Sequence, residues 1–114
     1  MRLGIAASLP HETPEEWAKK HKDAGLGAVV FPCNADAARE SIERYRDAAW
    51  ENDLVIAEVG IWNNLLDRDP EKRKRNLERC IAQLTLADSV HARCCVNISG
   101  STGALWDGGY AENY

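Results

Sequence analysis

The chain has 114 residues, of which 45% are hydrophobic and 28% are charged, and its formal net charge is −4. This length predicts one domain with a modest core. The mild acidity disfavours a dedicated nucleic-acid-binding protein, since such proteins are usually basic. No apolar run approaches the roughly 18 residues that a membrane-spanning helix needs. Pro10, His11 and Glu12 interrupt the N-terminal apolar patch, so a strand is expected there rather than a signal peptide. These features favour a cytoplasmic protein without a membrane partner.

The first predicted elements are a strand and a strongly signalled helix. An apolar run over residues 3–9 predicts the strand. Thr13 and Glu16 form a capping box with proline at the first helical position, which is typical of a helix start. The helix is expected to run over residues 14–24 and to end at Gly25, the residue type that commonly follows a helix.

A second strand and a second helix follow. Residues 28–32 predict a short strand that is buried on both faces. Asp36 is expected to open the next helix, because apolar residues then recur at steps of four, three and four. The apolar stripe of this predicted helix consists of Ala38, Ile42, Tyr45 and Ala49.

The pattern repeats with residues 54–62 as a third strand and with Asp69 and Pro70 as the start of a third helix. A fourth strand is predicted over residues 94–100. The predicted apolar face of the third helix consists of Leu77, Cys80, Ile81, Leu84 and Ala87.

Helices that alternate with apolar strands indicate right-handed βαβ units and a parallel sheet. The expected fold class is therefore α/β, with about four strands and three helices. The segment after residue 100 is rich in glycine and has no helical pattern, and four strands leave two sheet edges open. We therefore expect an incomplete, half-barrel-like arrangement. A complete flavodoxin-like domain is the alternative, but it would normally need a fifth strand and a last helix.

Alternate residues of the predicted strands differ in polarity. In the third strand one set is apolar: Val55, Ala57, Val59 and Ile61. The other set is Ile56, Glu58, Gly60 and Trp62. In the fourth strand the apolar set is Cys94, Val96 and Ile98, and the more polar set is Cys95, Asn97 and Ser99. A doubly wound sheet carries helices on both faces and needs two apolar sets, so a polar set favours a barrel interior.

The carboxyl ends of the strands are where α/β folds bind ligands, so the polar residues there are the candidate site. Glu58 is the main candidate, because a buried carboxylate needs partners. It would orient substrate hydroxyls or support a metal ligand, or it is a core residue satisfied by its neighbours. Trp62 would form an apolar wall for a ligand or plug the barrel mouth. The remaining predicted substrate-binding residues at these strand ends are Asn63, Asn97, Ser99 and His11.

Several of these residues, and other polar features, also have structural interpretations. His11 is either a ligand or proton carrier at the rim or a solvated loop residue. His21 and His91 are expected at the surface or as capping residues. The basic run 72–75 is expected on a solvated helix face, because cations there oppose the helix dipole.

The cysteines do not show the spacing of a zinc site. They are expected to be reduced, buried thiols of a cytosolic protein. The four residues are Cys33, Cys80, Cys94 and Cys95. Sequence motifs for dinucleotides, P-loop phosphates and serine hydrolases are also lacking.

The segments EVGIWNNLLD, DPEKRKRNLERCIAQLTLAD and CCVNISG, with the later WDGG, resemble the sugar phosphate isomerase/epimerase family, the xylose isomerase-like TIM barrels. The resemblance begins at LGIAASLP and covers nearly the whole chain. The segment WDGG resembles the family's loop after strand four, which implies that Trp106 binds substrate in a loop that covers the sugar; the alternative is a flexible glycine loop. It implies that residues 1–114 are a single N-terminal portion of an eight-stranded barrel. It also implies a parent enzyme that interconverts sugars or sugar phosphates by enediolate-type proton transfer, with a divalent metal (Mn, Mg, Co or Zn).

In epimerase-like members of that family the metal ligands and the proton-transferring carboxylates come from strands five to eight. The resemblance therefore assigns no catalytic and no metal-ligating residue to this chain, which is expected to be inactive alone. A related barrel enzyme, such as an inositol-type dehydratase or a hydroxypyruvate isomerase, is one alternative. A non-catalytic half-barrel that serves as a binding or scaffold protein is another. Because the sheet edges are open, self-association or pairing with a C-terminal half is expected.

Overall fold

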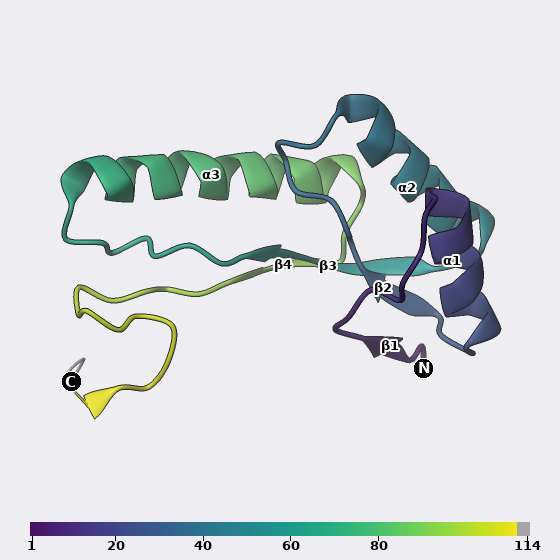
Figure 1. Ribbon diagram of the computed structural model, residues 1–114, viewed down its shortest axis with the longest axis horizontal. Helices are drawn as coiled ribbons and strands as arrows, with labels where there is room; N and C mark the ends of the chain where they lie inside the picture. The colour runs from purple at the N-terminus through teal and green to yellow at the C-terminus, as the bar shows by residue number, and fades with distance from the viewer. Residues whose placement is uncertain (112–114) are drawn as a thin grey trace.

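A computed structural model describes residues 1–111, so the expectations that concern residues 112–114 lie outside the described part of the chain. Strands and helices alternate along the chain (Figure 1). They are β1 (Gly4–Ile5), α1 (Pro14–Asp23), β2 (Ala28–Val30), α2 (Arg39–Glu51), β3 (Val55–Ile61), α3 (Pro70–Ser89) and β4 (Cys94–Asn97). All neighbouring strands pair in parallel in the order β1-β2-β3-β4. The predicted α/β class, with four parallel strands and three helices, is confirmed.

Two of the three helices begin where the sequence predicts, because their first N–H groups are capped by a side chain. The Thr13 hydroxyl accepts a hydrogen bond from the Glu16 N–H at the start of α1. The Asp69 carboxylate accepts from the first turn of α3, which begins with Pro70. The prediction for α2 was wrong at its start: the helix begins at Arg39, three residues after Asp36, and its N-cap position has no side-chain hydrogen bond.

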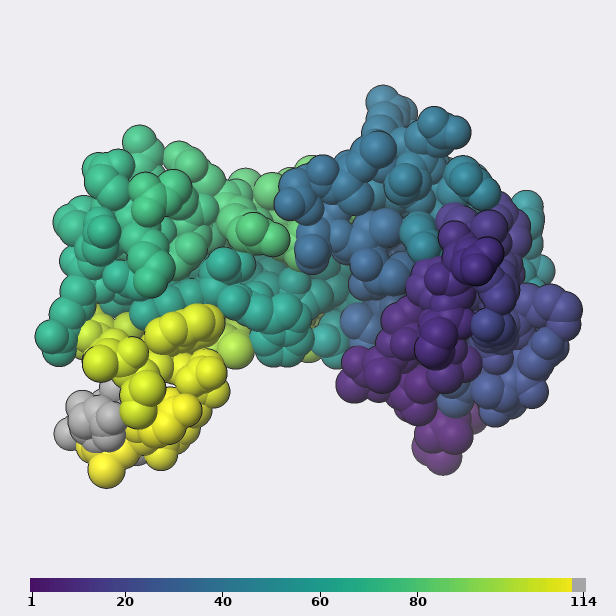
Figure 2. All heavy atoms as spheres, in the orientation of Figure 1, coloured from purple at the N-terminus to yellow at the C-terminus, as the bar shows by residue number. Residues whose placement is uncertain are grey.

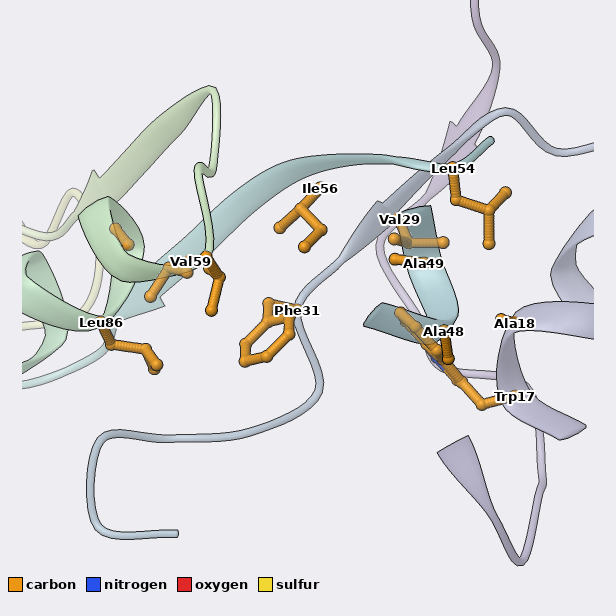
Figure 3. Packing of buried hydrophobic residues seen from close by; sticks show 12 residues of the cluster. Trp17, Ala18, Val29, Phe31, Ala48, Ala49, Leu54, Ile56, Val59 and Leu86 are labelled. Atoms are coloured by element: carbon orange, nitrogen blue, oxygen red, sulfur yellow. The ribbon is translucent and has the colours of Figure 1, made fainter. Parts of the chain in front are cut away.

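All three helices pack on the same face of the sheet around one core (Figures 1 and 3). Trp17 of α1, Ala49 of α2 and Leu86 of α3 belong to the same cluster as the strand residues Val29 and Val59. Sequential strand order with helices on one face is the geometry of a half-barrel, whereas a doubly wound sheet reverses its strand order and carries helices on both faces. None of the helices in the described part of the chain is long and apolar enough to cross a membrane.

The alternation of faces in β3 is broken by an irregularity at Ala57. Val29 pairs with Ile56, but the next pair joins Val30 to Glu58, so β3 contains one extra residue at this point. Ile56 therefore faces the helices and is only 2% exposed. The prediction that Ile56 shares the barrel-interior face with Glu58 was wrong. Strict alternation cannot anticipate an inserted residue. Beyond the irregularity, Val59 is buried on the helix side, as predicted.

The predicted orientation of β4 was wrong. Glu58 pairs with Cys94, and Ile61 pairs with Asn97. Laterally paired residues of a parallel sheet point to the same face, so Cys94 shares the face of Glu58. Cys95 packs against the core on the helix side, and Asn97 belongs to that side by register. The register between strands decides this orientation, and the weakly alternating β4 sequence does not specify it.

The buried face of α3 also differs from the prediction. Cys80, Leu86 and Ala87 are buried, but Leu77, Ile81 and Leu84 are about half exposed. The buried face of α3 also includes a polar residue, Gln83, which is 4% exposed. Its amide accepts from the Ala35 N–H at 2.7 Å and donates to the Gly60 carbonyl at 2.9 Å. These hydrogen bonds offset the cost of burying a polar side chain and attach α3 to the sheet.

Candidate functional site

The candidate site lies at the carboxyl ends of β3 and β4. There the loop between β3 and α3 meets the C-terminal segment, residues 98–111 (Figure 1). In the space-filling view this segment, in yellow, lies against the surface formed by the end of β3 and the following loop (Figure 2). Ligand sites of parallel α/β folds occupy this end of the sheet.

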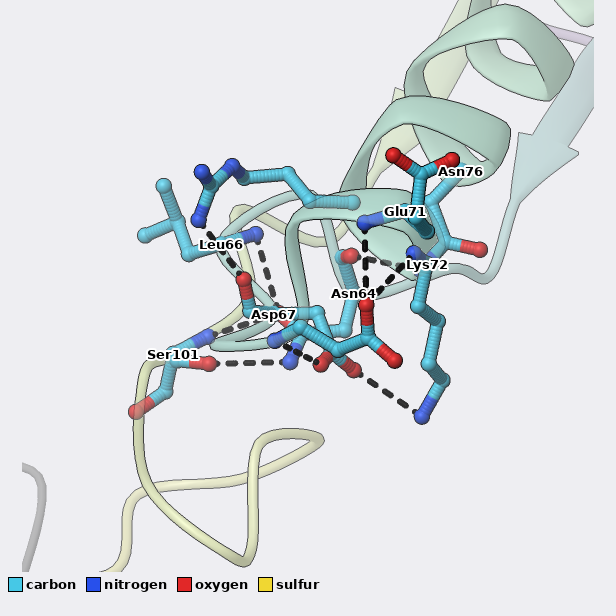
Figure 4. A network of polar contacts seen from close by, with 9 residues as sticks. Asn64, Leu66, Asp67, Glu71, Lys72, Asn76 and Ser101 are labelled. Atoms are coloured by element: carbon cyan, nitrogen blue, oxygen red, sulfur yellow. Dashed lines mark hydrogen bonds and ion pairs between the residues drawn. The ribbon is translucent and has the colours of Figure 1, made fainter.

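Asn64 joins these two segments (Figure 4). Its side-chain amide donates to the Ser101 carbonyl at 2.8 Å. Its Oδ1 accepts from the Ser101 N–H at 3.0 Å and from the Leu66 N–H at 3.1 Å. The Asn64 carbonyl accepts from the Asn76 side chain at 2.7 Å, which connects the junction to α3. Asn64 is only 4% exposed, so its hydrogen bonds position the C-terminal segment beside the end of β3.

Gly100 makes this junction possible. Its φ is +82°, a conformation that glycine adopts readily and other residues rarely do. A Cβ added at Gly100 would also collide with the Asn64 Oδ1. The close approach of the two backbone segments therefore depends on a glycine three residues after the end of β4.

Next to this junction is a cavity of about 560 Å³. Its wall carries the Ser99 and Thr102 residues, the Asp107 carboxylate and the Trp106 indole. Asp107 accepts a hydrogen bond from the Tyr110 hydroxyl at 3.1 Å. Hydroxyl and carboxylate groups beside an aromatic ring can form hydrogen bonds with a small polyhydroxylated molecule and cover one apolar face of it.

A second cavity, of about 390 Å³, adjoins the first and shares Thr102 and Trp106 with it. The charged residues in its wall are Asp67, Arg68 and Lys72. The Lys72 ammonium lies 2.9 Å from the Asp67 carboxylate. The hydrogen bond from Lys72 is the main cause that holds the pKa of Asp67 below its usual value.

Of the predicted substrate-binding residues, the structure places Ser99 and Trp106 together in the larger cavity. Asn97 is exposed and, by register, belongs to the helix side of the sheet. Asn63 is half-buried beside the Asn64 junction. Neither of these two asparagines lines the cavities that adjoin the junction.

Glu58 and Trp62 lie together on the face of the sheet without helices. The Glu58 carboxylate is half-buried and makes no hydrogen bond or ion pair with residues 1–111. The Trp62 ring lies over Gly60, where a Cβ would collide with the indole nitrogen. Trp62 is 57% exposed. An unpaired carboxylate beside an exposed indole fits ligand contact on this face, but neither residue lines the two cavities described above.

His11 lies at the junction of α1 and α2, and both of its ring nitrogens have partners inside the protein. Its Nδ1 is 2.7 Å from the Leu9 carbonyl, so this nitrogen donates. In the neutral ring Nε2 then accepts from the Tyr45 hydroxyl at 2.8 Å. Burial raises the pKa of Tyr45, so this hydroxyl keeps its proton near neutral pH. These contacts fasten the loop after β1.

His21 belongs to the same cluster and is only 1% exposed, so its predicted surface position was wrong. Its Nδ1 donates to the Trp17 carbonyl at 2.7 Å. The Trp17 ring packs between the rings of His21 and Tyr45, with centroids 5.3 and 5.4 Å away. The aromatic cluster is thus part of the helix packing.

Asn64 is the site residue that sequence reasoning missed. The sequence showed two adjacent amides after the third strand, and the prediction assigned the binding role to Asn63. Nothing in the local sequence distinguishes the two, because the difference is a set of hydrogen bonds to Ser101, 37 residues away. The glycine after the fourth strand was the available signal of a close backbone approach.

The described residues do not form a metal centre. Among residues 1–111, no group of three His, Cys, Asp or Glu side chains is placed to hold a metal ion. All four cysteines are free. Burial raises the pKa of the Cys33 and Cys95 thiols, which disfavours the thiolate form, and Cys94 is exposed rather than buried as predicted.

Searches against protein-family models, curated proteins and solved structures found no match for this chain.

Proposed function

We propose that this chain binds a sugar or sugar phosphate at the carboxyl end of its sheet. In this proposal it is the N-terminal portion of a TIM-barrel isomerase or epimerase. The observation that carries the proposal is the cavity of about 560 Å³ beside the Asn64 junction. Its serine, threonine, aspartate and tryptophan residues are a wall suited to sugar hydroxyls and to one apolar sugar face. The parallel βα architecture and the position of the cavity support the same function.

In this proposal the chain's own residues bind and orient the substrate. Asp107 accepts hydrogen bonds from sugar hydroxyls, and Trp106 covers the ring and excludes water. Glu58 adds a carboxylate on the face of the sheet that would become a barrel interior. Residues 1–111 contain no donor set for the divalent metal that the resemblance implies. The proton transfer that interconverts the sugars would need groups from a complementary half, so the chain alone binds without turnover.

An NMR titration tests this proposal directly. Unlabelled aldoses, ketoses and their phosphates are added to isotopically labelled protein, and we expect shifts at the Ser99, Thr102 and Asp107 amides and at the Trp106 indole N–H. Trp106→Leu should weaken binding by about tenfold, a typical effect of removing one well-packed aromatic contact. Trp50→Leu is the matched control, because Trp50 lies in another cavity, beside the first residues of β3. Absence of shifts with every sugar, or equal effects of the two variants, would refute the proposal.

A second candidate function is a cytoplasmic half-barrel that pairs with another half and serves as a binding or scaffold protein. The observation that favours it is a stripe of half-exposed apolar residues along α3: Leu77, Ile81 and Leu84. The spacing of these residues places them on one side of the helix. A helix that packs on this stripe would bury it.

Sedimentation equilibrium tests the pairing through self-association. We expect the protein to form dimers in a concentration-dependent manner and Ile81→Glu to shift it to monomers. Ala82→Glu is the matched control, because it introduces the same charge at an exposed position of α3 that lies about 100° around the helix from Ile81. A wild-type monomer at high protein concentration would contradict self-pairing.

A further inference from the structure

The smaller cavity at the site differs in chemistry from the larger one. It contains two basic side chains, Arg68 and Lys72, and it meets the larger cavity at Thr102 and Trp106. We propose that it binds the phosphate group of a phosphorylated sugar whose hydroxylated part occupies the larger cavity. This inference rests on the proposed function and deepens it by selecting sugar phosphates over free sugars.

The charges in the smaller cavity favour an anion. Asp67 is the acidic residue of its wall, and its carboxylate is already compensated. One oxygen lies 2.9 Å from the Lys72 ammonium, and the other accepts from the Asp69 N–H at 3.0 Å. Arg68, by contrast, makes no hydrogen bond or ion pair with the residues that the structure describes. The two cations and one anion leave a net positive charge, and Arg68 carries the uncompensated part.

Side chains, and not backbone N–H groups, would bind the anion, because the first N–H groups of α3 already donate to the Asp69 carboxylate. The Asp69 carboxylate accepts from the Glu71 N–H at 2.9 Å and from the Lys72 N–H at 3.2 Å. Figure 4 shows this cap beside the Lys72–Asp67 pair. An anion in the cavity would therefore be bound by the Arg68 guanidinium, with the Lys72 ammonium and the Thr102 hydroxyl as further donors.

The planar, two-pronged arrangement of guanidinium donors suits phosphate oxygens in particular. A phosphate monoester offers three terminal oxygens, enough for these donors together. The shared wall at Thr102 and Trp106 also places the two cavities next to each other, as a single ligand with a polar ring and a terminal phosphate requires.

The test compares ribose and glucose with their monophosphates by NMR titration of the intact chain. The charge-assisted contact of the phosphate with the Arg68 guanidinium should make the sugar phosphate bind about tenfold or more tightly than the free sugar. Arg68→Gln should abolish this gain and leave the dissociation constant of the free sugar unchanged. Inorganic phosphate should compete with the sugar phosphate and shift the amides around Arg68 and Thr102.

The matched control is Arg75→Gln, which removes the same charge at an exposed position of α3 that does not line the cavity. It should leave the preference for phosphate intact, which excludes a general charge effect. If free sugars bind but their phosphates bind no more tightly, or if Arg75→Gln reduces the preference as much as Arg68→Gln, the phosphate subsite is wrong and the proposed function stands. If neither sugars nor sugar phosphates bind, the proposed function fails together with the subsite.

Discussion

Replacing Asn64 by alanine should detach the C-terminal segment from the end of β3. The substitution removes three hydrogen bonds, two with Ser101 and one with the Leu66 N–H. A typical hydrogen bond contributes about 1 kcal/mol net, so the three together stabilise the junction by about 3 kcal/mol. This free energy corresponds to an increase of about a hundredfold in the local opening equilibrium. The core cluster does not include Asn64, so the strands should keep most of their stability.

Amide hydrogen exchange measures this local opening separately from global unfolding. We expect the Ser101 and Leu66 amides of the Asn64→Ala protein to exchange up to about a hundredfold faster. The Val59 amide, in the centre of β3, should exchange nearly as in the wild type. Asn63→Ala is the matched control, because Asn63 is the adjacent asparagine and its side chain makes no hydrogen bond within residues 1–111. Unchanged exchange at Ser101, or the same acceleration in Asn63→Ala, would refute the role of Asn64.

Two further predictions concern the same junction. Gly100→Ala should reduce the free energy of unfolding in urea more than Gly25→Ala. Both glycines have positive φ, which costs alanine about 1 kcal/mol, but only at Gly100 does the added Cβ collide with Asn64; equal losses would argue against that close approach. The pKa of Asp67, measured by NMR of the carboxyl carbon, should lie below 3.8 and rise in Lys72→Met. Because the folded-state pKa of Asp67 is lowered, the stabilisation that its ion pair with Lys72 contributes is complete above the unfolded-state pKa and is lost as the pH falls through the folded-state pKa. An identical titration midpoint of Asp67 in the wild type and in Lys72→Met would contradict this.

The candidate site was predicted only in part. The location at the strand ends followed from a general rule of parallel α/β folds, and Ser99, which this rule indicates, lines the larger cavity together with Trp106. The partners of a side chain cannot be read in the same way. His11 has a rim position in sequence, but its ring is bound between Leu9 and Tyr45. Asn97 has the expected residue type, but the register of β4 assigns it to the helix side.

The amino-acid sequence by itself determined the alternation of strands and helices and the starts of α1 and α3. These features depend on interactions among residues close along the chain, such as the caps of Thr13 and Asp69. Only the tertiary structure decided which face each residue presents. The extra residue in β3, the pairing of Glu58 with Cys94 and the burial of Gln83 all follow from contacts between elements distant in sequence. Local patterns do not encode such contacts, because register and helix rotation are set by packing the whole sheet against its helices.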